Sequence, residues 1–345
     1  MVTSAARGAH RGSFARATET RSRWVCLVVL LLGMVLFCPM WAHAQEEDVA
    51  RFPSRPVTYI QPYTAGVSAD LAMRVISKEA EKFLGQPVVV VNKPGAAGAI
   101  GVAAIATAKP DGYTIGNTGH SPIFVIPYFE KVPYHPINDF KMVMQFASFN
   151  QGVIVKADSP FKTFKDLIDF ARRNPKKLTY GTAGTNSMQF IIMEQIAKRE
   201  NVQITHIPFR ATGEAQTALL GGHVVVAAGD FNYSVLESKE ARLLVLFREE
   251  RAAEYPQTPI LKDFGYDFPL PMLITVAAPK GTPDGIAKKL EDAFTKAMKE
   301  PAFMRAMRED LRLPIVYRGS KDLTEYIARN YELYGKFLKE LGLLK

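Results

Sequence analysis

The residues best suited to chemistry are small and hydroxyl residues at the ends of predicted strands, where helices are expected to begin. A helix N-terminus in such a loop offers free backbone N–H groups and a positive dipole end to an anion. Five stretches share this composition: Thr64–Ser68, Gly95–Gly98, Thr118–Ser121, Thr182–Ser187 and Ala211–Gly213. Two facing sets of these loops would bind a carboxylate through N–H groups and hydroxyls. This chemistry needs no general acid, base or nucleophile.

No catalytic or metal-binding motif accompanies these loops. The histidines beyond residue 44 are far apart and lack the spacing of metal ligands; they are His120, His135, His206 and His223. Hydrolase, metalloprotease, phosphate-loop and dinucleotide fingerprints are missing from the sequence. Ser187 with a distant histidine could be imagined as a nucleophile pair, but no motif supports it. We therefore expect a non-enzymatic protein with no catalytic residue, no metal and no cofactor.

The first loop is placed by a predicted strand and a predicted helix. The strand is the β-branched and aromatic run at 57–61, and the helix covers 69–84 with an apolar face at helical spacing. Ser68 is the expected N-cap, and the charge of Asp70 complements the helix dipole.

The remaining loops repeat this arrangement in two units. Val88–Val91 is typical of a strand buried in a parallel sheet, and the glycine-rich loop 92–101 follows it. A second unit is expected to start near Asn150, with Thr163 as the N-cap of a helix at 164–173. Recurring strand, loop and helix segments predict right-handed βαβ units and an α/β fold.

The N-terminus has the pattern of a secretory signal peptide. Five arginines precede the apolar run Trp24–Phe37, and Ala42–Ala44 forms an A-x-A cleavage site. The run is about 14 residues, shorter than the roughly 20 that cross a bilayer as a helix. We expect removal of residues 1–44, with a retained anchor as the alternative.

Cleavage would change both the charge and the cysteine content. It lowers the formal net charge from +9 to +5 and removes both cysteines, Cys26 and Cys38. The mild remaining charge favours no nucleic-acid partner. A soluble mature chain without disulfides and a bacterial-type signal indicate the periplasm.

Several motifs, taken in order, resemble one known family. Pro62–Asp70 is similar to its P-[FY]-x-x-G-G-x-x-D, and Asn92–Gly101 to its N-[RK]-P-G-A-G-G-x-x-G. Ala108–Thr114 matches A-x-P-D-G-Y-T, the most specific signature. Tyr180–Gly184 and Ala278–Pro283 follow the same family pattern. These motifs resemble those of the periplasmic substrate-binding receptors of tripartite tricarboxylate transporters, called Bug proteins. The resemblance covers nearly all of residues 53–345.

The resemblance implies a fold and a division of the chain. The fold is the two-lobed type II periplasmic binding-protein fold, an α/β class in which each lobe is a mainly parallel sheet flanked by helices. A ligand cleft would lie between the lobes. Lobe 1 would be discontinuous, joining 53–149 to 272–345, and lobe 2 would span 150–271. Crossovers near Phe149 and Met272 would form the hinge.

The resemblance also implies ligand-binding residues at the matching positions. In lobe 1 they are Tyr63, Thr64, Ala65, Gly66, Val67, Ser68, Asp70, Ala97, Thr118, Gly119, His120 and Ser121. In lobe 2 they come from the stretch 182–187, with Thr182, Gly184, Thr185, Asn186 and Ser187, and from Phe209, Arg210 and Asp230.

Four of these positions depart from the family pattern. Val67 and Ser68 stand where glycines are common, and Ser68 could supply a hydroxyl contact instead. His120 replaces a small residue; it would either titrate near neutral pH or stack on an aromatic ligand, or be a partly exposed loop histidine. Arg210 replaces a lysine and could hold a second carboxylate bidentately.

Asp230 follows the family pattern, and its role stays open at this stage. It occupies the family's position after a strand. Its carboxylate would either accept a hydrogen bond from a ligand ammonium or hydroxyl group, or cap the next turn.

The expected function is capture of a small organic carboxylate by lobe closure. The ligand class includes di- and tricarboxylates, aromatic acids and acidic amino acids, and the expected partners are membrane permease subunits of a secondary transporter. We expect a monomer. A sensor that signals through a two-component kinase is the alternative, and a small-molecule hydrolase is a weaker one.

Overall fold

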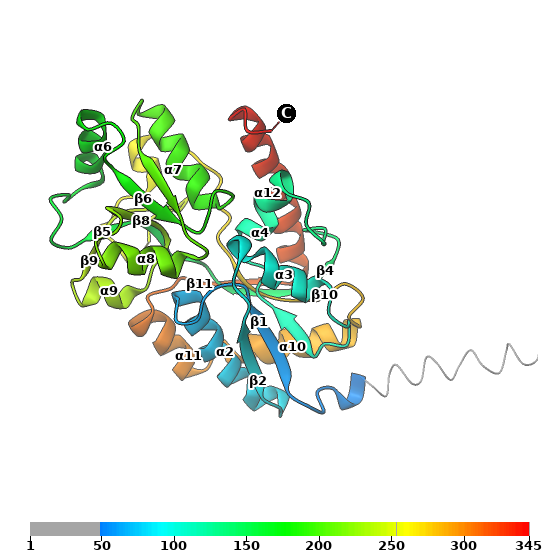
Figure 1. Cartoon of the computed structure of the whole chain (residues 1–345). Helices are drawn as coiled ribbons and strands as arrows, with labels where there is room; N and C mark the ends of the chain where they lie inside the picture. Colours follow the sequence, from blue (N-terminus) through cyan, green and yellow to red (C-terminus); the bar gives the residue numbers. More distant parts are fainter. Residues whose placement is uncertain (1–48, 253, 345) are drawn as a thin grey trace, which may run out of the picture. The chain divides into compact units, whose positions relative to one another are not determined.

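A computed structural model describes residues 49–252 and 254–344 of the chain (Figure 1). The description below concerns the compact unit within residues 53–345. The predicted signal peptide, residues 1–44, lies outside the described residues.

The first sheet has six strands in the order β11-β4-β10-β3-β1-β2. The strands are β1 (Val57–Gln61), β2 (Val88–Asn92), β3 (Thr114–Gly116), β4 (Phe140–Ala147), β10 (Ile274–Pro279) and β11 (Ile315–Gly319). β1 pairs in parallel with β2 and β3, whereas β10 pairs antiparallel with β3 and β4, and β11 antiparallel with β4. β4 and β10 are almost entirely buried, so they form the centre of the core.

Helices cover this sheet through their apolar faces. They are α2 (Ser68–Leu84), η1 (Ala96–Gly98), α3 (Ala99–Ala106), α4 (Ser121–Phe124), α5 (Ile126–Phe129), α10 (Asp284–Ala297), α11 (Pro301–Arg305), η3 (Ala306–Asp310) and α12 (Ser320–Glu340). α2 packs against α10, and its buried face includes Ala72, Met73 and Ile76. The helix ends at Gly85, whose φ of 71° is the left-handed conformation that glycine adopts without strain. Its N-cap is Val67 rather than the expected Ser68, which is the first helical residue.

The second sheet has five strands in the order β7-β6-β8-β5-β9. The strands are β5 (Gln151–Lys156), β6 (Thr179–Thr182), β7 (Thr205–Pro208), β8 (Val226–Asp230) and β9 (Ala241–Leu246). Its helices are α6 (Phe164–Arg173), α7 (Met188–Arg199), α8 (Thr212–Leu220), α9 (Tyr233–Glu237) and η2 (Leu261–Phe264). Leu219, Phe231 and Leu246 belong to a buried cluster on this sheet.

Both sheets are mixed, which corrects the expectation of mainly parallel sheets. The βαβ signals in the sequence cover β1–β3 and β6–β8, and those strands do pair in parallel. Every antiparallel pair involves β4, β5, β10 or β11. β4, β10 and β11 lie outside the predicted βαβ units, so no crossover helix sets their direction. β5 begins the second predicted unit, but it pairs antiparallel with β8 and β9 and not with β6, the strand that follows it in the chain. The two-lobed α/β class itself is confirmed.

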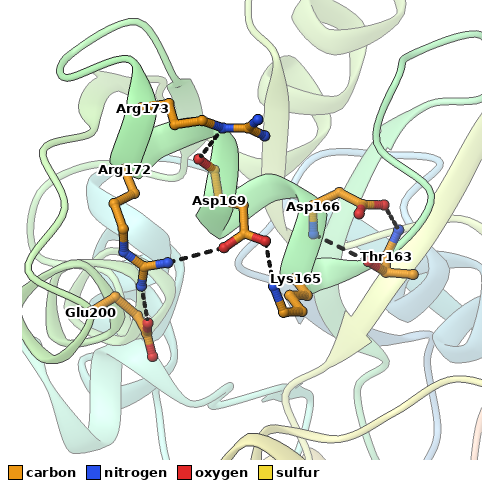
Figure 2. Close-up of polar contacts among 7 residues, drawn as sticks. All are labelled: Thr163, Lys165, Asp166, Asp169, Arg172, Arg173 and Glu200. Atoms are coloured by element: carbon orange, nitrogen blue, oxygen red, sulfur yellow. Dashed lines mark hydrogen bonds and ion pairs between the residues drawn. The ribbon is translucent and has the colours of Figure 1, made fainter.

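The start of α6 is fixed by a capping box (Figure 2). Thr163 Oγ1 accepts a hydrogen bond from Asp166 N at 3.1 Å, and Asp166 Oδ2 accepts one from Thr163 N at 2.8 Å. Asp169, further along the helix, pairs with Lys165 and with Arg172, and Arg172 also bridges to Glu200 at 2.8 Å. These ion pairs are exposed and contribute little, so the cap is the main local stabiliser.

We expect Thr163→Ala to lower the free energy of unfolding by about 1 kcal/mol, because the N–H group of Asp166 in the first turn loses its hydrogen bond to the Thr163 hydroxyl. Urea denaturation of the two proteins measures the difference. Thr163→Ser keeps the hydroxyl and should retain most of the stability. Equal losses in the alanine and serine variants would contradict a capping role.

Candidate functional site

A small enclosed cavity lies between the loops of the two sheets. Its lining residues are Tyr63, Thr64, Val67, Ala97, His120, Ser121, Phe149, Gln151, Ala183, Gln189, Thr212 and Asp230. Its volume is about 20 Å³, whereas one water needs roughly 10–15 Å³. In this conformation the cavity has room for little more than one water, so a carboxylic acid would enter only after the loops separate.

The loop between β1 and α2 places hydroxyl groups on one wall. Tyr63 packs edge-to-face on Phe149, with ring centroids 5.7 Å apart, and stacks beside His120 at 6.2 Å. The Tyr63 Oη and Thr64 Oγ1 atoms are buried and have no hydrogen-bond partner. Burial raises the pKa of Tyr63, so its hydroxyl stays neutral and able to donate. The predicted roles of these two residues are consistent with this geometry.

Asp70 organises this loop without lining the cavity. Its Oδ2 accepts hydrogen bonds from Gly66 N at 2.9 Å and from Arg74 Nε at 2.9 Å. Its Oδ1 accepts from Asn92 Nδ2 at 2.8 Å, and the same amide donates to Tyr63 O at 3.0 Å. Asp70 therefore fixes the backbone that presents Tyr63.

Ser68 and Asp230 join the two sides of the cavity. Ser68 Oγ, at the start of α2, lies 2.7 Å and 2.9 Å from the two carboxylate oxygens of Asp230, at the end of β8. The N–H groups of Ala69 and Phe231 also donate to this carboxylate. Ser68 thus supplies the hydroxyl contact expected of it, but to Asp230.

The Asp230 carboxyl group is held in a poorly solvated position. Its side chain belongs to a residue that is 8% exposed, and burial raises its pKa to about 7. The hydrogen bonds from Ser68, Ala69 and Phe231 lower the pKa, but burial outweighs them. Asp230 is therefore able to change its protonation state near neutral pH.

Two of the three sequence-based interpretations of His120 are wrong, and the third, stacking on an aromatic ligand, stays a prediction. The residue is 2% exposed, and burial lowers its pKa to about 3, so it neither titrates near neutral pH nor lies in an exposed loop. Its Nε2 lies 2.9 Å from Gln151 Nε2 and 3.0 Å from Gln189 Nε2, and its ring packs edge-to-face on Phe149 at 5.0 Å. The surrounding β5 and α7 remove water from the ring, a tertiary effect that the sequence did not indicate.

Other predicted residues shape the walls. Thr118 is buried against Thr275, with the two hydroxyl oxygens 3.0 Å apart. Ser121 lines the cavity, and its Oγ accepts a hydrogen bond from Met188 N at 3.1 Å. This bond joins the start of α4, beside the first sheet, to the start of α7, beside the second. Gly119 carries no side chain because Tyr63 occupies the space, and Ala97 lines the cavity.

The stretch 182–187 is mainly structural in this conformation. Thr182 Oγ1 lies 2.8 Å from His206 Nε2, and Ser187 caps α7 by accepting from Phe190 N at 3.2 Å. Asn186 donates to Glu130, Thr185 is exposed, and Gly184 has a φ of 99°. Of this stretch, only Ala183 lines the cavity.

A larger open cleft of about 710 Å³ adjoins the cavity. Thr64 and Val67 line both spaces, and Ala65, Gly66 and Phe209 line the cleft alone. Arg210 is exposed and lines neither space, so its role toward a second carboxylate stays a prediction.

Four lining residues were not predicted: Phe149, Gln151, Gln189 and Thr212. Gln189 carries the clearest signal, because it is a buried polar residue in the first turn of α7. Thr212 lies in one of the small-residue loops, and Phe149 and Gln151 flank the crossover between the sheets. A search for polar residues among apolar helix positions would have found Gln189.

We expect Gly119→Ala to weaken ligand binding by about tenfold or more. A Cβ at this position would lie 2.2 Å from Tyr63 Oη, so the phenol would be forced out of place. Isothermal titration with a bound carboxylate measures the change. Gly222→Ala is the matched control, since its φ of 76° adds the same backbone strain but its Cβ meets no atom within 4 Å. An equal effect in both variants would contradict the steric explanation.

Two α/β sheets with an enclosed polar cavity between their loops define a two-lobed binding-protein fold. Solved structures agree: the chain superposes on the periplasmic binding protein BugD with a TM-score of 0.78 and 25% identity, covering 85% of this chain and 100% of BugD. Residues 72–343 match the family described as "Tripartite tricarboxylate transporter family receptor". The chain belongs to this family of periplasmic receptors.

Relatives at the level of sequence and structure are consistent with this assignment. A Cupriavidus necator protein named "UPF0065 protein in gbd 5'region" is 36% identical over 307 residues, which is 89% of this chain and 92% of that protein. MatC from Rhodopseudomonas palustris, solved with bound malate, has a TM-score of 0.72 and 25% identity over 82% of this chain and 98% of its own. An R. palustris structure with adipate has a TM-score of 0.75 and 25% identity, and the match covers 84% of this chain and 98% of that one.

Two further observations concern the described residues. None of the helices within 49–252 and 254–344 combines the length and apolar character needed to cross a membrane. Within the same ranges, no cluster of three or more histidine, cysteine, aspartate or glutamate side chains could hold a metal ion.

Proposed function

We propose that this chain is a periplasmic solute receptor that captures a small organic carboxylate and delivers it to a tripartite tricarboxylate-type secondary transporter, without catalysing a reaction. The observation that carries the proposal is the cavity itself. Its walls offer unpartnered hydroxyls from Tyr63 and Thr64, and no lysine or arginine is among its lining residues. Neutral donors of this kind bind a carboxylate where water is excluded. The acids named in the MatC and adipate structures belong to the same chemical class.

The capture step would be closure of two lobes, 53–149 with 272–345 and 150–271. Ser148 Oγ donates to Met272 O at 2.9 Å, so the two proposed crossover segments are in contact, which supports a hinge at this place. Contacts between the proposed lobes include Ser68 with Asp230 and Asn232 Nδ2 with Gly66 O at 2.9 Å. These bonds would break on opening and re-form on closure around the ligand. Export would follow cleavage of the signal peptide after residue 44.

A thermal-shift screen of the mature chain, residues 45–345, tests this function. The panel contains mono-, di-, tri- and aromatic carboxylates and acidic amino acids. A ligand at 100 times its Kd should add about 2.7 kcal/mol to the free energy of unfolding. Uncharged amides of the same acids serve as controls and should give no shift. If the amides stabilise the chain as well as the acids do, carboxylate recognition is wrong.

A further inference from the structure

The hydrogen bonds around His120 determine which of its nitrogens carries the proton. The side-chain nitrogens of Gln151 and Gln189 lie 2.9 Å and 3.0 Å from His120 Nε2. An amide nitrogen can only donate, so with the amides in this orientation Nε2 accepts and the proton is on Nδ1, which has no hydrogen-bond partner of its own. One imidazole nitrogen has a single lone pair, which two amide groups cannot both use fully. The two glutamine amides therefore offer two donors to a single acceptor, His120 Nε2.

The same arrangement leaves two buried acceptors without partners. Gln151 Oε1 and Gln189 Oε1 make no hydrogen bond, although the residues are 0% and 2% exposed. Both side chains line the cavity, as does the carboxyl group of Asp230. Buried carbonyl oxygens in proteins are normally hydrogen-bonded, so each of these atoms requires a donor. The lining contains no lysine or arginine, and the hydroxyls of Tyr63 and Thr64 make no hydrogen bond to these oxygens.

Donors and acceptors are separated within the cavity. The hydroxyls of Tyr63 and Thr64 come from the loop after β1, and Gln151, Gln189 and Asp230 come from β5, α7 and β8. A carboxylate matches the hydroxyl side because it only accepts hydrogen bonds. The amide oxygens do not match a carboxylate and would repel it. The ligand must therefore present a different group to them.

We propose that Gln151 and Gln189 recognise a hydrogen-bond donor, a hydroxyl or ammonium group, that the bound carboxylate carries on its carbon chain. This inference rests on the proposed receptor function and narrows its ligand class to hydroxy and amino acids. His120 is a positioning residue: its Nε2 lies within hydrogen-bond distance of both amide nitrogens, and both amide oxygens are left without a protein partner. An acid without a donor would leave these oxygens unpartnered after closure and would bind more weakly.

Matched ligand series test the inference on the mature chain. Isothermal titration is run with succinate, malate and aspartate, and with acetate, glycolate and glycine. We expect the hydroxy or amino member to bind at least tenfold more tightly than the plain acid of its series. Equal affinity for plain and substituted acids would overturn the inference while leaving the carboxylate receptor intact. Loss of binding to every carboxylate tested would overturn both.

Variants separate recognition from folding. Gln189→Leu and Gln151→Leu should reduce the preference for the substituted acid toward unity, with little change in affinity for the plain acid. Gln189→Glu replaces a neutral acceptor by a charged one and should favour aspartate over malate. Gln195→Leu is the control, because Gln195 is a buried amide on the same helix that does not line the cavity.

A structural role for the glutamines would give a different result. It would lower affinity for plain and substituted acids alike and leave their ratio at the wild-type value. That outcome in both leucine variants, or an unchanged aspartate-to-malate ratio in Gln189→Glu, would contradict the proposal. The ratio is measured on folded protein, so a partial loss of stability does not obscure it.

Discussion

Replacing Asp230 by asparagine is expected to remove a large part of the pH dependence of stability between pH 4 and pH 8. Burial raises the pKa of this carboxyl group to about 7, and the hydroxyl of Ser68 and two backbone N–H groups do not fully compensate. Asparagine is close in shape but has no charge to desolvate. The variant should therefore be more stable than the wild type at pH 8.

The sign follows from the two states of the carboxyl group. Below pH 3.8, its ordinary pKa, it is protonated in both the unfolded and the folded chain and has no effect on the pH dependence. Between this value and about 7 the unfolded chain releases the proton while the folded chain keeps it, so stability falls as pH rises. The difference of about three between the two pKa values lowers the free energy of unfolding by about 4 kcal/mol by pH 7. Above pH 7 both states are ionised and the loss is constant.

Urea denaturation of the two proteins at pH 4, 5.5, 7 and 8 measures this difference. The free energies of unfolding should diverge with rising pH up to about pH 7 and then run parallel. Asp70→Asn is a useful comparison, because Asp70 is also buried but is paired with Arg74 at 2.9 Å. Parallel curves for wild type and Asp230→Asn over the whole range would show that the carboxyl group is not desolvated as described.

Opening of the proposed lobes would relieve the same desolvation. Asp230 lies at the end of β8 and Ser68 at the start of α2, so separation of these elements would hydrate the carboxylate. Small-angle X-ray scattering should then show a larger radius of gyration for the ligand-free wild type above pH 7. The Asp230→Asn variant should show no such change. An identical pH response in both would assign the expansion to other groups.

Gly101→Val is expected to lower the free energy of unfolding by about 3 kcal/mol and to abolish ligand binding at ordinary concentrations. Gly101 lies in α3, where a Cβ would be 2.6 Å from Pro62 Cα and 2.9 Å from Lys93 O. Backbone atoms cannot rotate away, so the helix or the loop must move. Pro62 directly precedes Tyr63, and displacement of the loop would carry the cavity wall with it.

Thermal and urea denaturation measure the first effect, and titration with a bound carboxylate measures the second. Ile100→Val is the control, because Ile100 is on the same helix and 54% exposed. It should change stability by no more than about 0.5 kcal/mol. Loss of stability without loss of binding would show that α3 moves instead of the loop.

Much of the local structure follows from the sequence. The strand at 57–61, the helix ending at Gly85 and the Thr163 cap are all present, because glycine stops, caps and apolar spacing act within a few residues. The mixed pairing of the sheets did not follow. β10 is separated by long stretches of chain from the strands beside it, and nothing local fixes its direction.

The residues of the candidate site also fall into those that the sequence predicted and those that it did not. Thr64 and Ser121 lie in loops whose residue types suit helix N-termini after strands, and the position of Tyr63 was implied by the family resemblance. Gln151 was not predicted, because an amide in a strand has no distinctive spacing, and Gln189 was missed although it is a polar residue among apolar helix positions. The burial of His120 was also missed, since it depends on side chains more than 30 residues away in the sequence.

The sequence by itself therefore determined where the loops with small and hydroxyl residues follow the strands, and it predicted that they bind a carboxylate. The tertiary structure decided which atoms meet: it placed Ser68 against Asp230, buried that carboxyl group and left two amide oxygens without a hydrogen-bond partner. Residue types and periodicity act locally along the chain. Desolvation and hydrogen-bond partnership depend on neighbours that only the packed lobes bring together.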